Sequence, residues 1–306
     1  MNYDIIGDIH GHDGALVAIL DKLGYREHVG AWQRPGHMVI FVGDFIDRGP
    51  GQIETVNLVR SMVDHGSALA VMGNHEFNAM AWSTPHHSKS GEFLRPHSDK
   101  NHRQHAAFLK ATSDTPELRQ EILDWFMDLP LWLDLPELRV VHACWNPAAM
   151  ATLSPRLRPG NRLDRAMLHA ASCRGSSEFA AIELILKGPE VELPEGMRFK
   201  QGDDMRSEAR TRWWDDQAIT YRESAIVDEL TRPSLPDLPI PTDLRFAYAA
   251  DKPLFIGHYW MTGGPALLSP RVACVDYSAG RGEPLGAYRW QGEKDLLASH
   301  FVSAAG

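Results

Sequence analysis

The sequence predicts an α/β fold organised around a parallel β-sheet. Three times before residue 80, a short apolar run is followed by Gly and a cluster of Asp, Asn or His, after which apolar residues recur with helical spacing. Strand, polar loop and helix in that order are typical of βαβ units, whose strands lie parallel in one sheet. Because parallel strands end at the same edge of a sheet, the three polar clusters are expected to lie together there.

Each predicted unit can be located in the sequence. The strands are expected over residues 3–6, 37–42 and 68–72. The loops that follow them are Gly7-Asp8-Ile9-His10-Gly11, Gly43-Asp44-Phe45-Ile46-Asp47-Arg48-Gly49-Pro50 and Gly73-Asn74-His75-Glu76. The helices begin after the first loop, near Ile53 and near Phe77, and the first has apolar residues at i, i+3, i+4 and i+7 from Leu16 to Leu23.

The convergent loops are too polar to be buried without ions or dense hydrogen bonding. Carboxylate, imidazole and amide oxygen without thiolate suit Mn, Fe, Zn, Co or Ni, and suit neither a structural zinc site nor a calcium cage. Asp8 and His10 lie two residues apart on an extended segment, so they can face the same side, and Asp44 on the next strand could bridge to a second ion. Two such ions can clamp an in-line displacement at phosphorus.

These three loops resemble, in order and in spacing, the signature blocks of the phosphoprotein phosphatase branch of the calcineurin-like metallophosphoesterases. The close resemblance covers about the first 80 residues, and two later single-His matches follow it. It implies two mixed β-sheets packed face to face with helices outside, a four-layer α/β/β/α sandwich, with the metals at one edge. The predicted fold is thus a single metallophosphoesterase domain over residues 1–306, with an inserted cap over about 146–242 that shapes substrate choice.

The resemblance also implies a site, carried over onto matching positions. His142 and His258 each end a β-rich run, where the family places two further metal ligands. Asp8, His10 and Asp44 would hold one metal, and the other would be held by Asp44, Asn74, His142 and His258. His75 would be the general acid, oriented by Asp47. Arg48 would bind the phosphoryl oxygens.

Two positions are not decided by the resemblance. The family has a second phosphate-binding Arg in the interval that here contains Arg198, Arg206, Arg210 and Arg212, of which Arg212 is chosen. Ala143-Cys144-Trp145 follows His142 where the family usually has Gly, which changes the expected pocket wall.

The remaining chain gives weaker indications. Residues 83–114 are expected to be rich in loops, with surface or loop positions for their five histidines, His86, His87, His97, His102 and His105. Glu76 is expected to accept hydrogen bonds beside the site or at the helix start. Trp213-Trp214 fits either a stacking platform or the core. A helix is expected over 115–127, a hairpin over 131–141, and strands at 254–257, 272–277 and 285–290.

The composition excludes several classes of protein. The formal charge of −9 over 306 residues argues against a general nucleic-acid binder. Three scattered Cys indicate neither a disulfide framework nor a thiolate zinc site. The N-terminus lacks the features of a signal peptide, and apolar runs are too short for a membrane helix, so a cytoplasmic location is expected.

The expected function is a metal-dependent phosphoric ester hydrolase. Two divalent ions, with Mn²⁺ the first expectation, would support attack of a metal-bridging hydroxide on phosphate monoesters, including phosphoserine or phosphothreonine in proteins. The alternative within the family is symmetrical cleavage of dinucleoside tetraphosphates, and the alternative from another class is a catalytically silent binding module. The expected partner is a phosphoprotein, a small phosphoester or a dinucleoside polyphosphate.

Overall fold

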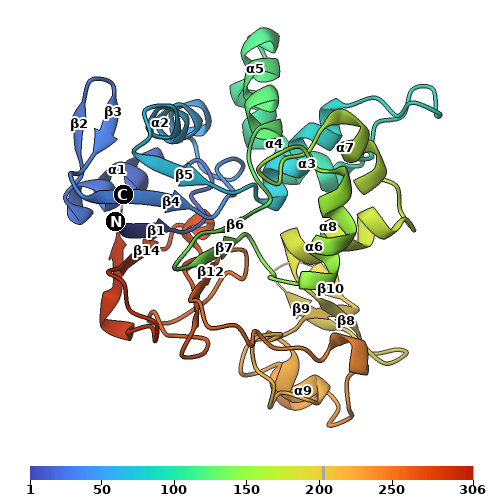
Figure 1. Ribbon diagram of the computed structural model, residues 1–306. Coiled ribbons are helices and arrows are strands. Elements are labelled where there is room, and N and C mark those ends of the chain that lie inside the picture. The colour runs from blue at the N-terminus through green and yellow to red at the C-terminus, as the bar shows by residue number, and fades with distance from the viewer. Residues whose placement is uncertain (202–203, 306) are drawn as a thin grey trace.

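The computed structural model describes residues 1–201 and 204–305, in which two mixed β-sheets pack face to face between helices (Figure 1). The first sheet has the order β15-β14-β1-β4-β5. β1, β4 and β5 are mutually parallel, as the three βαβ units predict, while β14 is antiparallel to β1. Their bounds are β1 Asn2–Ile6, β4 His37–Phe41, β5 Ala68–Ala70, β14 Leu285–Trp290 and β15 Phe301–Ala304.

The second sheet has the order β13-β12-β7-β6. β12 is parallel to both of its neighbours, and β6 pairs with β7 in the antiparallel hairpin that the sequence predicts. The bounds are β6 Trp132–Asp134, β7 Arg139–Val141, β12 Leu254–Ile256 and β13 Val272–Cys274. The predicted pair of mixed sheets is therefore confirmed.

An apolar core holds the two sheets together. Ile5 and Ile40 from the first sheet pack in one cluster with Val140 and Phe255 from the second, and all four are fully buried. Their strand neighbours Ile6 and Phe41 point to the opposite face and join the cluster beneath the helices, because alternate residues of a strand face opposite sides. The alternation lets each sheet bury both faces.

The helices that cover the first sheet follow the predicted pattern. In α1 the four leucines and isoleucines of the predicted stripe are all buried, and Gly24 ends the helix in the left-handed conformation. The helix expected over 115–127 is α5, with Pro116 in its first turn. The bounds are α1 Asp13–Leu23, α2 Gln52–Asp64, α3 Asn74–Ser83 and α5 Pro116–Met127.

Among the described residues outside 146–242, one α-helix and three strands were not predicted. Residues 83–114, expected to be loop-rich, contain the helix α4 Asp99–Ala111, whose N-cap Ser98 accepts a hydrogen bond from the Asn101 amide. Only His105 and Phe108 of α4 are buried. The rest of its sequence is mostly polar, so it lacks the apolar periodicity from which a helix is predicted. The others are the short hairpin β2 Arg26–His28 with β3 Ala31–Gln33, and the edge strand β15.

The segment over 146–242 lies beside the sheets and has a small core of its own (Figure 1). Val191, Phe199 and Ala225 are buried in that core. Trp213 and Trp214 are instead buried in the main core, which decides between the two expectations for this pair. The elements are α6 Pro147–Leu153, α7 Arg165–Ala171, α8 Ser177–Lys187, β8 Glu190–Glu192, β9 Phe199–Gln201, β10 Asp204–Arg206, β11 Glu208–Arg210 and α9 Tyr221–Ser224. Among the described residues, none of the helices combines the length and apolarity needed to span a bilayer.

Candidate active site

The loops that follow β1, β4 and β5 meet at one edge of the first sheet, as the sequence predicts. The loops after β7 and β12 of the second sheet reach the same place, and they contribute His142 and His258. Asp44, Asn74, His75 and His258 line a cavity of about 660 Å³ there. Segments separated by more than 200 residues thus form one site.

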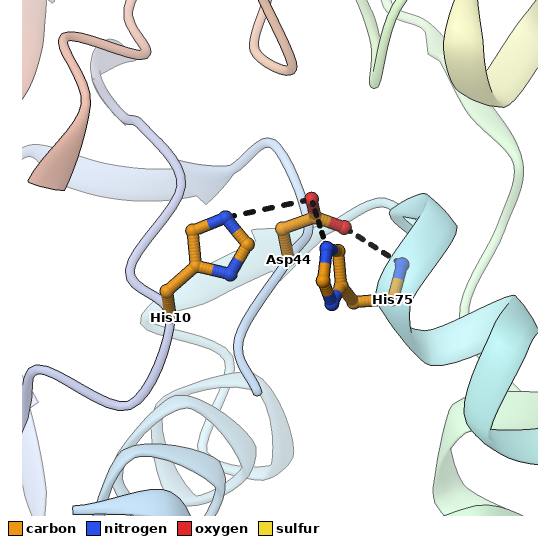
Figure 2. A group of neighbouring side chains, drawn as sticks. All are labelled: His10, Asp44 and His75. Carbon is orange, nitrogen blue, oxygen red and sulfur yellow. Dashed lines mark hydrogen bonds and ion pairs between the residues drawn. The ribbon is translucent and has the colours of Figure 1, made fainter. Parts of the chain in front are cut away.

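Asp44 lies at the centre of two groups of candidate metal ligands. Its Oδ2 is 3.7 Å from His10 Nε2 and 3.4 Å from His142 Nε2. One group is His10, Asp44 and His75, and the other is Asp44, His142 and His258, with potential ligand atoms within 4.8 Å of one another in each. Figure 2 shows His10 and His75 on either side of the Asp44 carboxylate. A shared carboxylate between two such groups suits a pair of metal ions.

Backbone carbonyls orient two of the histidines toward Asp44. His10 Nδ1 lies 3.0 Å from the Ile46 carbonyl oxygen, and His142 Nδ1 lies 2.7 Å from that of Val42. When each Nδ1–H donates to its carbonyl, Nε2 keeps a free lone pair that faces the carboxylate. Metal-binding histidines are commonly held in this way.

Several buried polar atoms in the site have no hydrogen-bond partner within the part of the chain that the structure describes. They include Asp8 Oδ1, His10 Nε2 and both ring nitrogens of His258, in side chains that are at most 3% exposed. Leaving such atoms unpaired in the interior costs about 1–3 kcal/mol each. A metal ion would satisfy Asp8 Oδ1, His10 Nε2 and one ring nitrogen of His258, so the donor set fits the metal ions that the resemblance implies.

The pKa shifts of Asp8 and His10 also fit a metal site. Burial, Asp276 and Asp44 together raise the pKa of Asp8 well above its usual value. Burial also lowers the pKa of His10 to about 4, so this imidazole is neutral at pH 7 and free to bind a metal. A divalent cation next to Asp8 would favour its ionised form.

The backbone is strained at the same residues. Asp44, Asp47, Arg48, His10 and His258 all have positive φ angles between 50° and 77°. Non-glycine residues rarely adopt this conformation, which costs about 1–3 kcal/mol in such settings. The surrounding fold therefore holds these loops in a backbone conformation that these residue types do not favour. The conformation is explained by the positions that their side chains need in the site.

His75, Asp47 and His105 form a line of hydrogen bonds at the cavity wall. His75 Nδ1 lies 2.5 Å from Asp47 Oδ2, and His105 Nδ1 lies 2.9 Å from Asp47 Oδ1. Burial lowers the pKa of His75, but Asp44 and Asp47 outweigh it, and the net shift is upward. The expectation that His105 lies at the surface is wrong: it is 4% exposed, because α4 packs it against Asp47. His105 lies in a mostly polar helix, so no pattern in the sequence indicates that it contacts Asp47.

Removing the donor of His105 should disturb Asp47. We expect His105→Leu to lower kcat about tenfold, because Asp47 then orients His75 with one hydrogen bond fewer. His105→Asn, which keeps an N–H donor near the same place, should recover much of the loss. The exposed His102 on the same helix provides the control, His102→Leu, with unchanged kcat. Equal losses in the Leu and Asn variants of His105 would contradict this role.

Glu76 ties two of the site loops together. Its carboxylate accepts hydrogen bonds from the backbone amides of Asp44, Phe45 and Gly73, at 2.8, 2.8 and 2.9 Å. Gly73 has no room for a side chain, since a Cβ atom there would lie 2.2 Å from Asp44 Oδ1. The expected acceptor role of Glu76 is therefore found, and it supports the loop that carries Asp44.

Glu76 should contribute strongly to stability. We expect Glu76→Ala to lower the free energy of unfolding by at least about 3 kcal/mol, because three buried amides lose their acceptor. Urea unfolding followed by circular dichroism measures this change. Glu121, which is 59% exposed and pairs with Arg60, supplies the control Glu121→Ala, for which a change within about 0.5 kcal/mol is expected. A loss below 1 kcal/mol in Glu76→Ala would show that water or other groups replace the carboxylate.

The arginines of the cavity differ from the choice made on the sequence. Arg48 lines the cavity as expected, but Arg212 is not among the described residues that line it. Arg210 does line it, and its guanidinium donates to the His258 carbonyl oxygen at 3.0 Å. Arg212 lies beyond the end of β11, where its backbone amide donates to the Ser224 carbonyl oxygen at 2.8 Å, whereas Arg210 is the last residue of the strand.

Residues 1–144 match the family described as calcineurin-like phosphoesterase. The resemblance stated from the three loops is thereby confirmed for residues 1–144, and the fold of these residues is that of the calcineurin-like metallophosphoesterases. A solved protein serine/threonine phosphatase from Saccharomyces cerevisiae has the same fold. Its TM-score is 0.55 at 17% identity, over 100% of this chain and 80% of that one.

Two groups of curated relatives carry more specific names. An asymmetrical bis(5'-nucleosyl)-tetraphosphatase from Halalkalibacterium halodurans is 46% identical over 76 residues, 24% of this chain and 31% of the relative. A symmetrical bis(5'-nucleosyl)-tetraphosphatase from Psychromonas ingrahamii is 31% identical over 145 residues, 47% of this chain and 44% of the relative. The matched part thus spans less than half of either relative.

Proposed function

We propose that the protein hydrolyses phosphoric esters with the help of two divalent metal ions. The observation that carries the proposal is the position of Asp44 between two groups of buried ligands, several of whose polar atoms have no protein partner. A catalytically silent binding module would have no use for the His75–Asp47 pair beside that centre.

The metal ions would be held as the family pattern implies. Asp8, His10 and Asp44 would hold one, while Asp44 and three further residues, Asn74, His142 and His258, would hold the other. Asn74 Oδ1 lies 3.2 Å from His142 Nε2, so both can turn to one ion. Mn²⁺ is the first candidate, and Fe, Zn, Co and Ni suit the same donors. When bound, the ions would activate water and offset charge on the phosphoryl oxygens.

The protein side chains would supply the proton and the orientation. As the water oxygen bonds to phosphorus and the bond to the leaving oxygen breaks, His75 would donate its Nε2 proton to that oxygen. Asp47 would hold Nδ1 and keep the imidazole protonated beforehand. Arg48 would bind the equatorial phosphoryl oxygens, and Arg210 takes the role first given to Arg212.

Two substrate classes remain in the proposal. Phosphate monoesters, including phosphoserine and phosphothreonine in proteins, are supported by the site and by the fold shared with a serine/threonine phosphatase. Dinucleoside tetraphosphates are supported by the names of the relatives. They are also supported by the cavity, whose lining among the described residues includes eight Arg or Lys and five Asp or Glu although the whole chain carries a charge of −9.

The segment over 146–242 forms part of the cavity wall through Glu183, Arg206 and Arg210. We therefore propose that it acts as a cap that selects the substrate. The three cysteines are unpaired, and two of them are buried, which supports a reducing compartment such as the cytoplasm.

The proposal is tested by activity after chelation and readdition of Mn²⁺. p-Nitrophenyl phosphate, a phosphoserine peptide and diadenosine tetraphosphate are the substrates. We expect turnover of at least one of them only with metal, and the preferred one identifies the substrate class. If metal binds but none is cleaved, the hydrolase proposal fails and the binding module takes its place.

A further inference from the structure

Arg281 and Trp260, two residues from loops of the second sheet, lie at the cavity wall next to Arg48. The guanidinium carbon of Arg48 is 4.8 Å from the centroid of the Trp260 ring, and that of Arg281 is 4.4 Å from it. Both arginines therefore stack on one indole at the edge of the candidate metal centre. Neither belongs to an ion pair with a carboxylate among the described residues.

Trp260 places this pair of arginines beside His10, one of the candidate metal ligands. Its ring centroid lies 5.7 Å from that of His10. The loop that carries Arg281 is equally close, because a Cβ atom on Gly280 would lie 2.6 Å from the His10 ring. Arg48 and Arg281 thus extend the cavity wall from the ligands outward.

One buried carboxylate fixes both loops. Asp276 Oδ2 accepts a hydrogen bond from the Trp260 amide at 2.7 Å, and Oδ1 accepts one from the Ser278 amide at 2.9 Å. A third link runs from Ser278 Oγ to the Met261 carbonyl oxygen at 3.2 Å. Trp260 and Ser278 both have positive φ angles, 54° and 66°. The structure therefore holds Arg281 and Trp260 in place although their backbone is unfavourable.

Arg48 and Arg281 carry like charges against one indole, and only the charge of Arg48 is offset by nearby Asp47 and Asp44. Arg281 forms no ion pair with a carboxylate among the described residues, so an anion bound there would relieve the repulsion between the two arginines. Two other cations of the cavity already have carboxylate partners: Lys187 pairs with Glu183, and Arg206 pairs with Glu190. A single phosphoryl group at the metals would occupy Arg48. Arg281 would then be available to bind a second negatively charged group that is attached to this phosphoryl group.

We propose that Arg281, aligned with Arg48 by Trp260, binds a phosphate adjacent to the one that is cleaved. Arg281 is then a specificity-determining residue that favours phosphoanhydride chains, such as those of dinucleoside polyphosphates, over simple monoesters. This inference rests on the proposed hydrolase function and assigns its substrate class. The planar guanidinium suits the role because it gives two parallel hydrogen bonds to one phosphate while it stacks on the indole.

The test compares two substrates in the same metal-loaded enzyme. We expect Arg281→Ala to lower kcat/KM for diadenosine tetraphosphate about 10- to 100-fold more than kcat/KM for p-nitrophenyl phosphate, the effect of losing charge-assisted hydrogen bonds to one phosphate. Arg281→Lys should recover part of this ratio. Trp260→Leu should lower the ratio less, since Arg281 keeps its charge but loses its alignment. Arg26→Ala is the control, because Arg26 lies on β2 and its side chain is 67% exposed.

A second readout does not depend on turnover. In chelator-treated protein, calorimetry should show pyrophosphate binding more tightly than inorganic phosphate, and Arg281→Ala should remove most of that difference. Equal losses on both substrates, with pyrophosphate binding unchanged, would overturn the assignment of Arg281 while leaving the hydrolase function intact. If the wild type cleaves no substrate, the hydrolase proposal fails, and the pyrophosphate titration alone decides whether the subsite exists.

Discussion

Asp44→Asn is expected to lower kcat by at least about 10³-fold, the largest effect of any single substitution in this protein. The variant keeps the shape of the side chain and the Oδ1 acceptor for the His75 amide, which is 2.9 Å away. It removes the negative charge that both candidate ligand groups share. Loss of metal-derived stabilisation worth several kcal/mol corresponds to a factor of this size.

Metal content gives an independent measure of the Asp44 substitution. After gel filtration, elemental analysis of the wild type loaded with Mn²⁺ should approach two ions per chain, and Asp44→Asn should retain fewer. Asp21→Asn is the matched control, because Asp21 on α1 is 63% exposed and lies in a surface ion pair. Full metal content and activity in Asp44→Asn would contradict a shared carboxylate at the centre.

His75→Asn is expected to lower kcat by about 10²- to 10⁴-fold while metal content stays at the wild-type level. The loss should be larger on a phosphoserine peptide than on p-nitrophenyl phosphate, because the nitrophenolate leaves without needing a proton. This dependence on the leaving group separates a general acid from a residue that only shapes the pocket. The exposed His28 on β2 supplies the control His28→Asn.

An equal loss on both substrates would show that His75 acts by another route, such as binding a metal. The structure is compatible with metal binding by His75, because its Nε2 lies 3.9 Å from Asp44 Oδ2. His75 also belongs to the same group of candidate metal ligands as His10. Asp47 favours the acid role, since its hydrogen bond to Nδ1 points Nε2 toward the cavity. Metal analysis of the same variant distinguishes the two.

The parts of the fold that the sequence predicts are those with local signals. The strands β1, β4 and β5 and the helix α1 combine clear periodicity with Gly-rich turns, and each lies close to its predicted position. The loops between them carry most of the candidate site. The helix α4 was missed because only His105 and Phe108 face inward, which is too few for a visible stripe.

The side chains that escaped prediction act across long separations. His105 reaches Asp47 from 58 residues away, and Asp276 holds a loop that begins 16 residues earlier. The choice among four arginines was equally open, since it depends on how the strands of the segment over 146–242 pack beside the cavity, where Arg206 and Arg210 line the wall. Such contacts arise from tertiary packing between distant segments, so no periodic sequence pattern predicts them.

The sequence by itself determined the order of the strands and loops and predicted the class of site, because metal chemistry needs particular residue types in loops that directly follow parallel strands. Asp8, His10, Asp44, Asn74 and His75 could be named for that reason. Only the tertiary structure decided what surrounds them: Glu76 beneath the loops, His105 behind Asp47, and Arg281 stacked on Trp260. Ligand identity is a local property of a motif, whereas support and specificity arise where distant segments of the chain pack against one another.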